Sequence, residues 1–185
     1  MAQYHAHLKS ISRADGRSAT GAIAYRAACK IVDDRTGLEF DFTKKKGVEH
    51  SQIFFPPGEE NTRPDLHDTS ALWNEVEKKD RKSNSRYAKE FNVALPVELS
   101  ESEQKELLTK YVQENFVDEG MVADVAIHRD HPDNPHAHVM LTNRPFNSDG
   151  TWGIKSKKQY ILDKNGNKTY TGTSKYPKKI GRAHV

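Results

Sequence analysis

Alternation of apolar and polar side chains predicts five β-strands along this chain. Successive side chains of a strand point to opposite faces of a sheet, so an alternating segment has one apolar face and one polar face. The segments with this pattern, or with a short apolar run bounded by turn residues, are 3–11, 51–55, 85–95, 121–128 and 136–143. In the last two, the residues predicted to face the core are Ala123, Val125, Ile127, Ala137, Val139 and Leu141.

Apolar residues at helical spacing predict three helices between these strands. They cover residues 18–30, about 65–79, and 100–120. Ser100 and Glu103 have the spacing of a capping box, which marks the start of the third helix. The second helix is expected to expose its two outer acidic residues, Glu75 and Glu77.

Three histidines are predicted to converge at the end of the last two strands. His136 and His138 lie on the same face of one strand, separated by a single small residue. His128 ends the preceding strand, and a polar turn rich in Asp, Asn and Pro connects the two. A hairpin would bring the three imidazoles together, in a geometry that can hold one divalent cation and leave positions open for a substrate. His131, in the middle of the turn, is expected to be solvated.

Strand parity adds neighbours to this histidine cluster. Glu90 and Asn92 fall on the less apolar face of their strand, as do His5 and His7 on the first strand. The element order indicates an α+β fold, with an antiparallel sheet of about five strands and helices packed on one face. The open face would then carry the metal site.

Composition limits the class of protein. The chain has 185 residues, of which 35% are hydrophobic and 30% are charged, enough for one domain with broad polar surfaces. It contains no apolar run long enough for a bilayer span and no pattern typical of a signal peptide. Its single cysteine, Cys29, excludes an internal disulfide framework and suits a reducing compartment. A cytoplasmic protein is therefore expected.

Charge divides the chain into a core and a basic tail. Residues 155–182 contain nine Lys or Arg and one acid, with interleaved tyrosines, a pattern typical of contact with a phosphate backbone. A solvated, flexible tail is the alternative. We expect a core domain over residues 1–150 and a basic C-terminal segment over 151–185, with a hairpin turn at Asn165-Gly166.

The sequence offers few groups that could attack a phosphate or an acyl carbon. It has no P-loop, no G-x-S-x-G elbow and no cysteine–histidine pair near the cluster. Tyr25, on the first helix, could attack a phosphodiester and form a covalent phosphotyrosine that keeps the bond energy for rejoining. By residue chemistry alone, a tyrosine in such a position is more often part of the core than a nucleophile.

Several motifs taken together resemble the MobA/MobL family of conjugative relaxases. They are the start Met1-Ala2-Gln3-Tyr4-His5, the Gly16-Arg17-Ser18-Ala19 turn, Ala24-Tyr25-Arg26-Ala27, Glu90 within Ala88-Lys89-Glu90, and the run from Asn134 to Thr142 around His136-Ala137-His138. The likeness extends from Met1 to about Lys158. It covers the relaxase core of a superfamily named after its His-hydrophobic-His motif, and implies that the basic C-terminal segment is truncated relative to larger transfer proteins.

The resemblance implies a role for each site residue. Tyr25 matches the nucleophile that cuts one strand at the nic site of an origin of transfer (oriT) and keeps the 5′ phosphate. His128, His136 and His138 match the metal ligands, and Glu90 an acid that accepts the phenolic proton or orients a ligand. Together with the basic turn and the basic tail, the resemblance implies that DNA is contacted by His5, Lys9, Arg13, Arg17, Lys155, Lys157 and Lys158.

The same resemblance implies cofactors and partners. The metal in the cell would be Mg or Mn, whereas three imidazoles by ligand preference suit Mn, Ni or Zn, which purified protein could carry. The partners would be single-stranded oriT DNA, accessory relaxosome proteins and a type IV secretion coupling protein. Three alternatives stay open: a replication initiator or transposase of the same superfamily, a metal-dependent nuclease using activated water, and a nucleic-acid-binding module with a structural ion.

Overall fold

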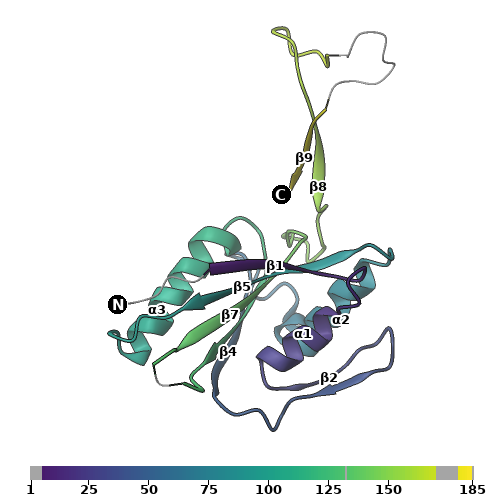
Figure 1. Cartoon of the computed structure of the whole chain (residues 1–185). Coiled ribbons are helices and arrows are strands. Elements are labelled where there is room, and N and C mark those ends of the chain that lie inside the picture. Colours follow the sequence, from purple (N-terminus) through teal and green to yellow (C-terminus); the bar gives the residue numbers. More distant parts are fainter. Residues whose placement is uncertain (1–5, 132, 170–178, 185) are drawn as a thin grey trace.

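A five-stranded antiparallel sheet forms the centre of the computed structural model, which describes residues 6–131, 133–169 and 179–184. In spatial order the strands are β1 (Ala6–Ser12), β5 (Arg86–Ala94), β7 (His136–Thr142), β6 (Ala123–His128) and β4 (Val48–Phe54) (Figure 1). The α+β class and the number of strands in the main sheet are those predicted. The hairpin of β6 and β7 lies inside the sheet, between β5 and β4.

The strand register aligns the polar residues in cross-strand rows. His128 pairs with His136, and His138 lies between Ala126 and Asn92. Glu90 lies opposite Met140 on one side and Lys9 on the other. Because these positions have the same parity, their side chains share one face of the sheet.

Helix α3 (Glu101–Val112) covers the opposite face. The capping box predicted for its start is present, since Ser100 and Glu103 each bond the other's backbone amide. A π-helical turn (Gln113–Val117) extends the helix, and Gly120, with φ of 94°, ends it. The core on this side consists of Phe54, Phe91, Leu95, Leu108, Val112, Val117, Ala123, Val125, Ile127, Ala137, Val139 and Leu141.

Helices α1 (Ala19–Arg26) and α2 (Thr69–Lys79) add a second helical layer, on the face that carries the histidines. A short 3₁₀ turn (Pro64–His67) precedes α2. The two helices cover the half of this face where Ile11, Ala88 and Met140 are buried. The prediction that helices pack on one face only is therefore too simple, because helices also cover these apolar residues on the other face. The other half of the face, at the end of β6 and the start of β7, holds the histidines.

Helix α1 ends four residues earlier than predicted, at Arg26. Ala27 is its C-cap, and Ala28 adopts a left-handed conformation with φ of 51°, which stops the helix. The chain then forms a small hairpin of β2 (Lys30–Val32) and β3 (Glu39–Asp41), which packs on α1. Tyr25 consequently lies in the last turn of α1, at the edge of the helical layer.

Glu77 is buried, so the prediction that it is solvated is wrong. Its Oε1 accepts hydrogen bonds from the backbone amides of Ala19 (2.6 Å) and Thr20 (3.3 Å). The first amides of a helix have no partner within the helix, and a carboxylate placed there satisfies them and the helix dipole. Burial raises the pKa of Glu77. The start of α1 is thereby fastened to α2.

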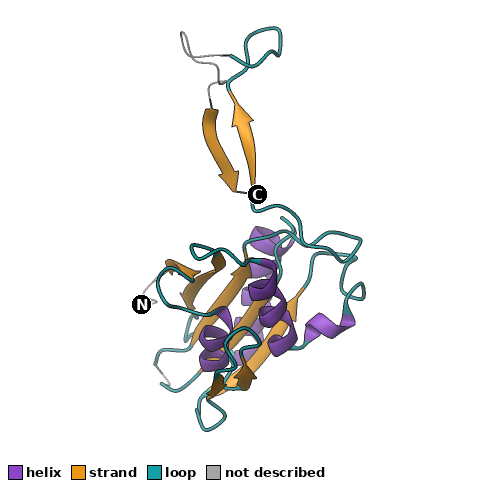
Figure 2. Cartoon of the chain, turned by 90° about the vertical axis from the view of Figure 1, so that its right-hand side faces the viewer, coloured by secondary structure: helices purple, strands orange, loops and turns teal. Residues whose placement is uncertain are grey.

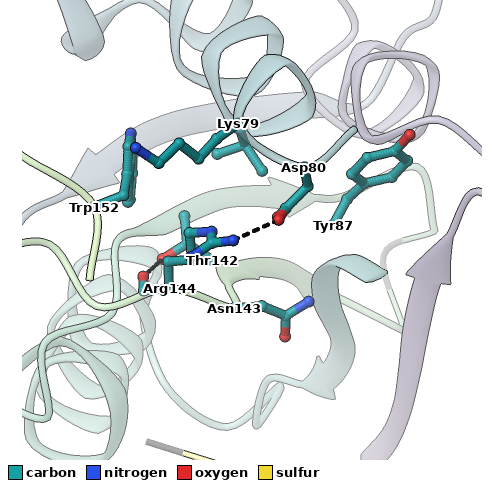
Figure 3. Close-up of a pocket in the computed structure, with 8 residues that line it drawn as sticks. Lys79, Asp80, Tyr87, Thr142, Asn143, Arg144 and Trp152 are labelled. Carbon is teal, nitrogen blue, oxygen red and sulfur yellow. Dashed lines mark hydrogen bonds and ion pairs between the residues drawn. The ribbon is translucent and has the colours of Figure 1, made fainter. Parts of the chain in front are cut away.

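The chain remains part of the core beyond residue 150. Trp152 is 8% exposed and packs in the α1–α2 core, and its Nε1 donates to Glu75 at 2.7 Å. Asp80 accepts from Arg144 at 2.8 Å (Figure 3). It also accepts from Lys155 at 2.5 Å. The contacts of Trp152 and Lys155 lie beyond residue 150, where the sequence predicts the end of the core, and we propose that the core extends to Lys155.

A two-stranded ribbon follows Lys155. β8 (Ser156–Tyr160) pairs antiparallel with β9 (Lys179–His184), and Lys158 lies opposite Arg182 in the register. The ribbon stands apart from the helices and strands of the core (Figure 2). The predicted Asn165-Gly166 turn is confirmed, with Gly166 at φ of 81° and the amide of Asp163 bonded to the carbonyl of Asn167. Among the described residues, no helix is long and apolar enough to cross a membrane.

Candidate metal centre and its neighbours

The three predicted histidines converge. One ring nitrogen from each of His128, His136 and His138 lies within 4.8 Å of those of the other two. Their ring centroids are separated by 4.4 to 5.3 Å. His128 is buried, whereas His136 and His138 are half-buried, so the cluster opens to solvent on one side.

Backbone carbonyls orient two of the three rings. Nε2 of His128 lies 2.6 Å from the carbonyl oxygen of Arg26, and Nδ1 of His136 lies 3.0 Å from that of Asn134. A carbonyl can only accept, so these nitrogens carry the protons, and the lone pairs lie on Nδ1 of His128 and Nε2 of His136. Such outer hydrogen bonds are typical of histidines that bind metal.

The environment of His138 and the neutral state of the histidines also favour binding of a cation. Nδ1 of His138 is buried without a hydrogen-bond partner, which is unusual for a polar atom inside a protein. Burial and the neighbouring His128 lower the pKa of His138 to about 3, and burial lowers the pKa of His128. Neutral imidazoles are the form that binds metal. The three histidines therefore fit a divalent ion that prefers imidazole ligands.

Tyr25 lies at the end of α1 with half of its side chain exposed. Its ring packs edge-on against Phe42, with centroids 5.3 Å apart, and the ammonium of Lys45 lies 3.8 Å above the ring. The same ammonium bonds the Tyr25 carbonyl (3.1 Å) and lies 3.4 Å from Nδ1 of His128. One lysine thus connects the tyrosine with the histidine cluster.

Glu90 is 4% exposed and is paired with two arginines. It forms ion pairs with Arg26 and, at 3.2 Å, with Arg17. The guanidinium of Arg26 also donates to the carbonyl of Ala22 at 2.5 Å. Glu90 is therefore connected to the histidines through Arg26, whose carbonyl orients His128.

Comparison with known proteins identifies the family of this chain. Residues 17–182 match the model of the MobA/MobL family. The chain belongs to the MobA/MobL family. It is 36% identical over 181 residues to mobilization protein MobL of Acidithiobacillus ferridurans, and 32% identical over 182 residues to conjugal transfer protein TraA of Agrobacterium fabrum. These matches cover 84% and 95% of this chain but only 46% and 16% of those relatives.

A solved structure supports the same grouping. It addresses the molecular basis of vancomycin resistance transfer in Staphylococcus aureus, and its chain superposes with a TM-score of 0.76 at 31% identity. The match covers 84% of this chain and 78% of the other. The histidine cluster lies within the part of this MobA/MobL chain that matches the family model.

The cations predicted to contact DNA fall into two groups in this MobA/MobL chain. Arg13 donates to the hydroxyl of Tyr87 (2.5 Å) and to the carbonyl of Arg81 (2.6 Å). Arg17 and Lys155 are engaged with Glu90 and Asp80. The structure therefore shows intramolecular roles for these three cations.

The remaining predicted contacts lie elsewhere. Lys9 is exposed on the edge strand β1. Lys157 and Lys158 belong to the β8–β9 ribbon, and His5 lies outside the described residues. Sequence reasoning missed Arg26 and Lys45 as neighbours of the histidines. Arg26 was visible only as part of the family motif, and Lys45 only as the middle of a lysine run.

Proposed function

We propose that this MobA/MobL chain is the relaxase core of a conjugative transfer protein, which nicks one strand of oriT DNA with Tyr25. The observation that carries the proposal is the placement of Tyr25 beside a three-histidine cluster, connected to it through Lys45 and Arg26. A tyrosine next to a cation site is suited to transfer of a phosphoryl group to the phenol.

His128, His136 and His138 would hold a divalent cation, Mg or Mn in the cell and Mn, Ni or Zn in purified protein. Once bound, such a cation would withdraw negative charge from the scissile phosphate. The outer hydrogen bonds to Arg26 and Asn134 would keep the rings of His128 and His136 oriented for this ion.

In the cleavage step, Oη of Tyr25 forms a bond to phosphorus and the bond from phosphorus to the 3′ oxygen breaks. The phenolic proton is lost and the leaving oxygen takes up a proton, which gives a 5′-phosphotyrosine and a free 3′-OH. The reverse reaction rejoins the strand without nucleotide hydrolysis. Since the Tyr25 side chain is 49% exposed, water can accept its proton.

Glu90 is better suited to positioning than to accepting that proton. Both of its carboxylate oxygens are already held in ion pairs, one with Arg26 and one with Arg17. Its pairing with Arg26 fixes the residue that follows Tyr25 and orients His128. We assign Glu90 the role of holding this part of the site together.

The substrate would be single-stranded oriT DNA, with the β8–β9 ribbon and Lys9 as its basic contacts. Accessory relaxosome proteins and a type IV secretion coupling protein would act with it in the cytoplasm. The curated relatives named above are more than twice as long as the matched region. These partners would therefore act on the whole transfer protein.

One assay tests the cleavage chemistry. The protein is incubated with labelled single-stranded DNA carrying the cognate nic site and Mn²⁺, and the products are separated on a denaturing gel. We expect a covalent protein–DNA adduct, absent in Tyr25→Phe and retained in Tyr111→Phe, which alters an exposed tyrosine on α3. Cleavage without adduct would indicate a nuclease that uses activated water, and an undiminished adduct in Tyr25→Phe would exclude this nucleophile.

A further inference from the structure

The turn that carries Lys45 is fixed on both sides. The amide of Lys45 bonds the carbonyl of Phe42 at 2.9 Å, and the carbonyl of Gly47 accepts from the amide of Arg129 at 2.7 Å. Gly47 has φ of 84°, and a Cβ there would come within 2.9 Å of the Asp130 backbone. The chain therefore approaches the end of β6 as closely as glycine allows, which places Lys45 against His128.

The ammonium of Lys45 lies where the lone pair of His128 points. Since Nε2 of His128 donates to Arg26, Nδ1 is its unprotonated nitrogen, and the ammonium lies 3.4 Å from it. The other contacts of the ammonium are with Tyr25, through the carbonyl and the ring face. A single cation thus occupies the gap between the predicted nucleophile and a predicted metal ligand.

We propose that Lys45 is a phosphate-binding residue that shares Nδ1 of His128 with the metal. In metal-free protein its ammonium caps this lone pair, and with metal bound it turns to a non-bridging oxygen of the scissile phosphate beside Tyr25. One lone pair cannot serve two cations, and an ammonium and a divalent ion repel each other at this separation. The flexible four-carbon stem of lysine allows the movement. The phosphate half of this inference rests on the proposed function.

The first test needs no DNA. Mn²⁺ binding is measured by calorimetry on metal-free wild type, Lys45→Met, Lys45→Arg and Lys46→Met, the last altering an exposed lysine of the same turn. Removal of the competing charge should tighten Mn²⁺ binding in Lys45→Met by about tenfold. Lys45→Arg and Lys46→Met should stay near wild type. Unchanged or weaker binding by Lys45→Met, with a wild-type melting temperature, would overturn the shared use of His128.

The second test measures adduct formation at saturating Mn²⁺, so that metal occupancy does not differ. Lys45→Met should form the adduct roughly 100-fold more slowly, the usual effect of removing one group that stabilises charge in the transition state. Lys45→Arg should recover part of the rate, and Lys46→Met should match wild type. A wild-type rate in Lys45→Met would refute phosphate binding. If wild type forms no adduct, both the proposed function and phosphate binding by Lys45 are refuted. The calorimetry still tests whether Lys45 and the metal compete for Nδ1 of His128.

Discussion

Nε2 of His128 donates a hydrogen bond of 2.6 Å to the carbonyl oxygen of Arg26, the residue that follows Tyr25. This bond joins the end of α1 to the end of β6, two elements that are 102 residues apart in the chain. It sets the orientation of a predicted metal ligand and the position of the predicted nucleophile at the same time. The side chain of Arg26 is held in turn by Glu90.

We expect Glu90→Gln to lower stability as well as activity. The substitution leaves the buried guanidinium of Arg26 without its counter-charge, which should cost about 3 kcal/mol in the free energy of unfolding. Urea unfolding measures this loss, with Glu106→Gln on the exposed face of α3 as the control. If Glu90 were a general base, Glu90→Gln would in addition change the pH profile of cleavage, whereas a positioning role leaves that profile as in wild type.

Replacing His138 by Ala should abolish tight Mn²⁺ binding, because one of three converging ligands is removed. His131→Ala, in the exposed turn between β6 and β7, should bind Mn²⁺ like wild type. Calorimetry on the two variants measures the difference, and a chelator should stop cleavage by wild type. Cleavage that continues undiminished in chelator would show that the metal is not needed.

Strand periodicity was sufficient to predict the histidine cluster. Only two faces exist in a strand, so parity alone places His136 and His138 together, and the short turn brings back His128. The same argument correctly placed Glu90 and Asn92 on this face. Predictions of this kind hold because a strand allows each side chain only two orientations.

Contacts between distant elements could not be predicted in this way. The bond from His128 to Arg26 depends on α1 ending at Arg26, which the left-handed Ala28 decides, whereas helical periodicity continued to Lys30. Glu77 was expected to be solvated because it lies on the outer face of its helix. Its partners are the first amides of α1, 57 and 58 residues away in the chain.

Asp124 should make stability depend on pH in an identifiable way. It is fully buried beneath Trp73, whose Nε1 donates to it at 2.9 Å, and burial raises its pKa to about 6. Its folded pKa exceeds its unfolded value, so its contribution is full below about pH 4 and is lost as pH rises through about 6.

The variant Asp124→Asn keeps an acceptor for Trp73 and removes the charge. Above pH 6 it should therefore be more stable than wild type, by up to about 3 kcal/mol, and the difference should shrink as pH falls toward 4. Urea unfolding of metal-free protein at intervals from pH 4 to pH 8 measures this. A difference that does not change with pH would show that Asp124 titrates normally.

The basic ribbon offers a final prediction, about DNA affinity. An earlier cut of the chain, such as after Asn147, would remove the buried Trp152 and damage the core, so substitutions are the better test. Lys157→Gln with Lys158→Gln should weaken binding of single-stranded DNA and lower its salt dependence, by about 0.7 in the logarithmic slope for each phosphate that the protein no longer neutralises. The control is Lys110→Gln, an exposed lysine on α3. Equal affinity and an equal salt slope in the double variant would mean that the DNA does not follow β8, and would leave Lys9 on β1 as the next cation to replace.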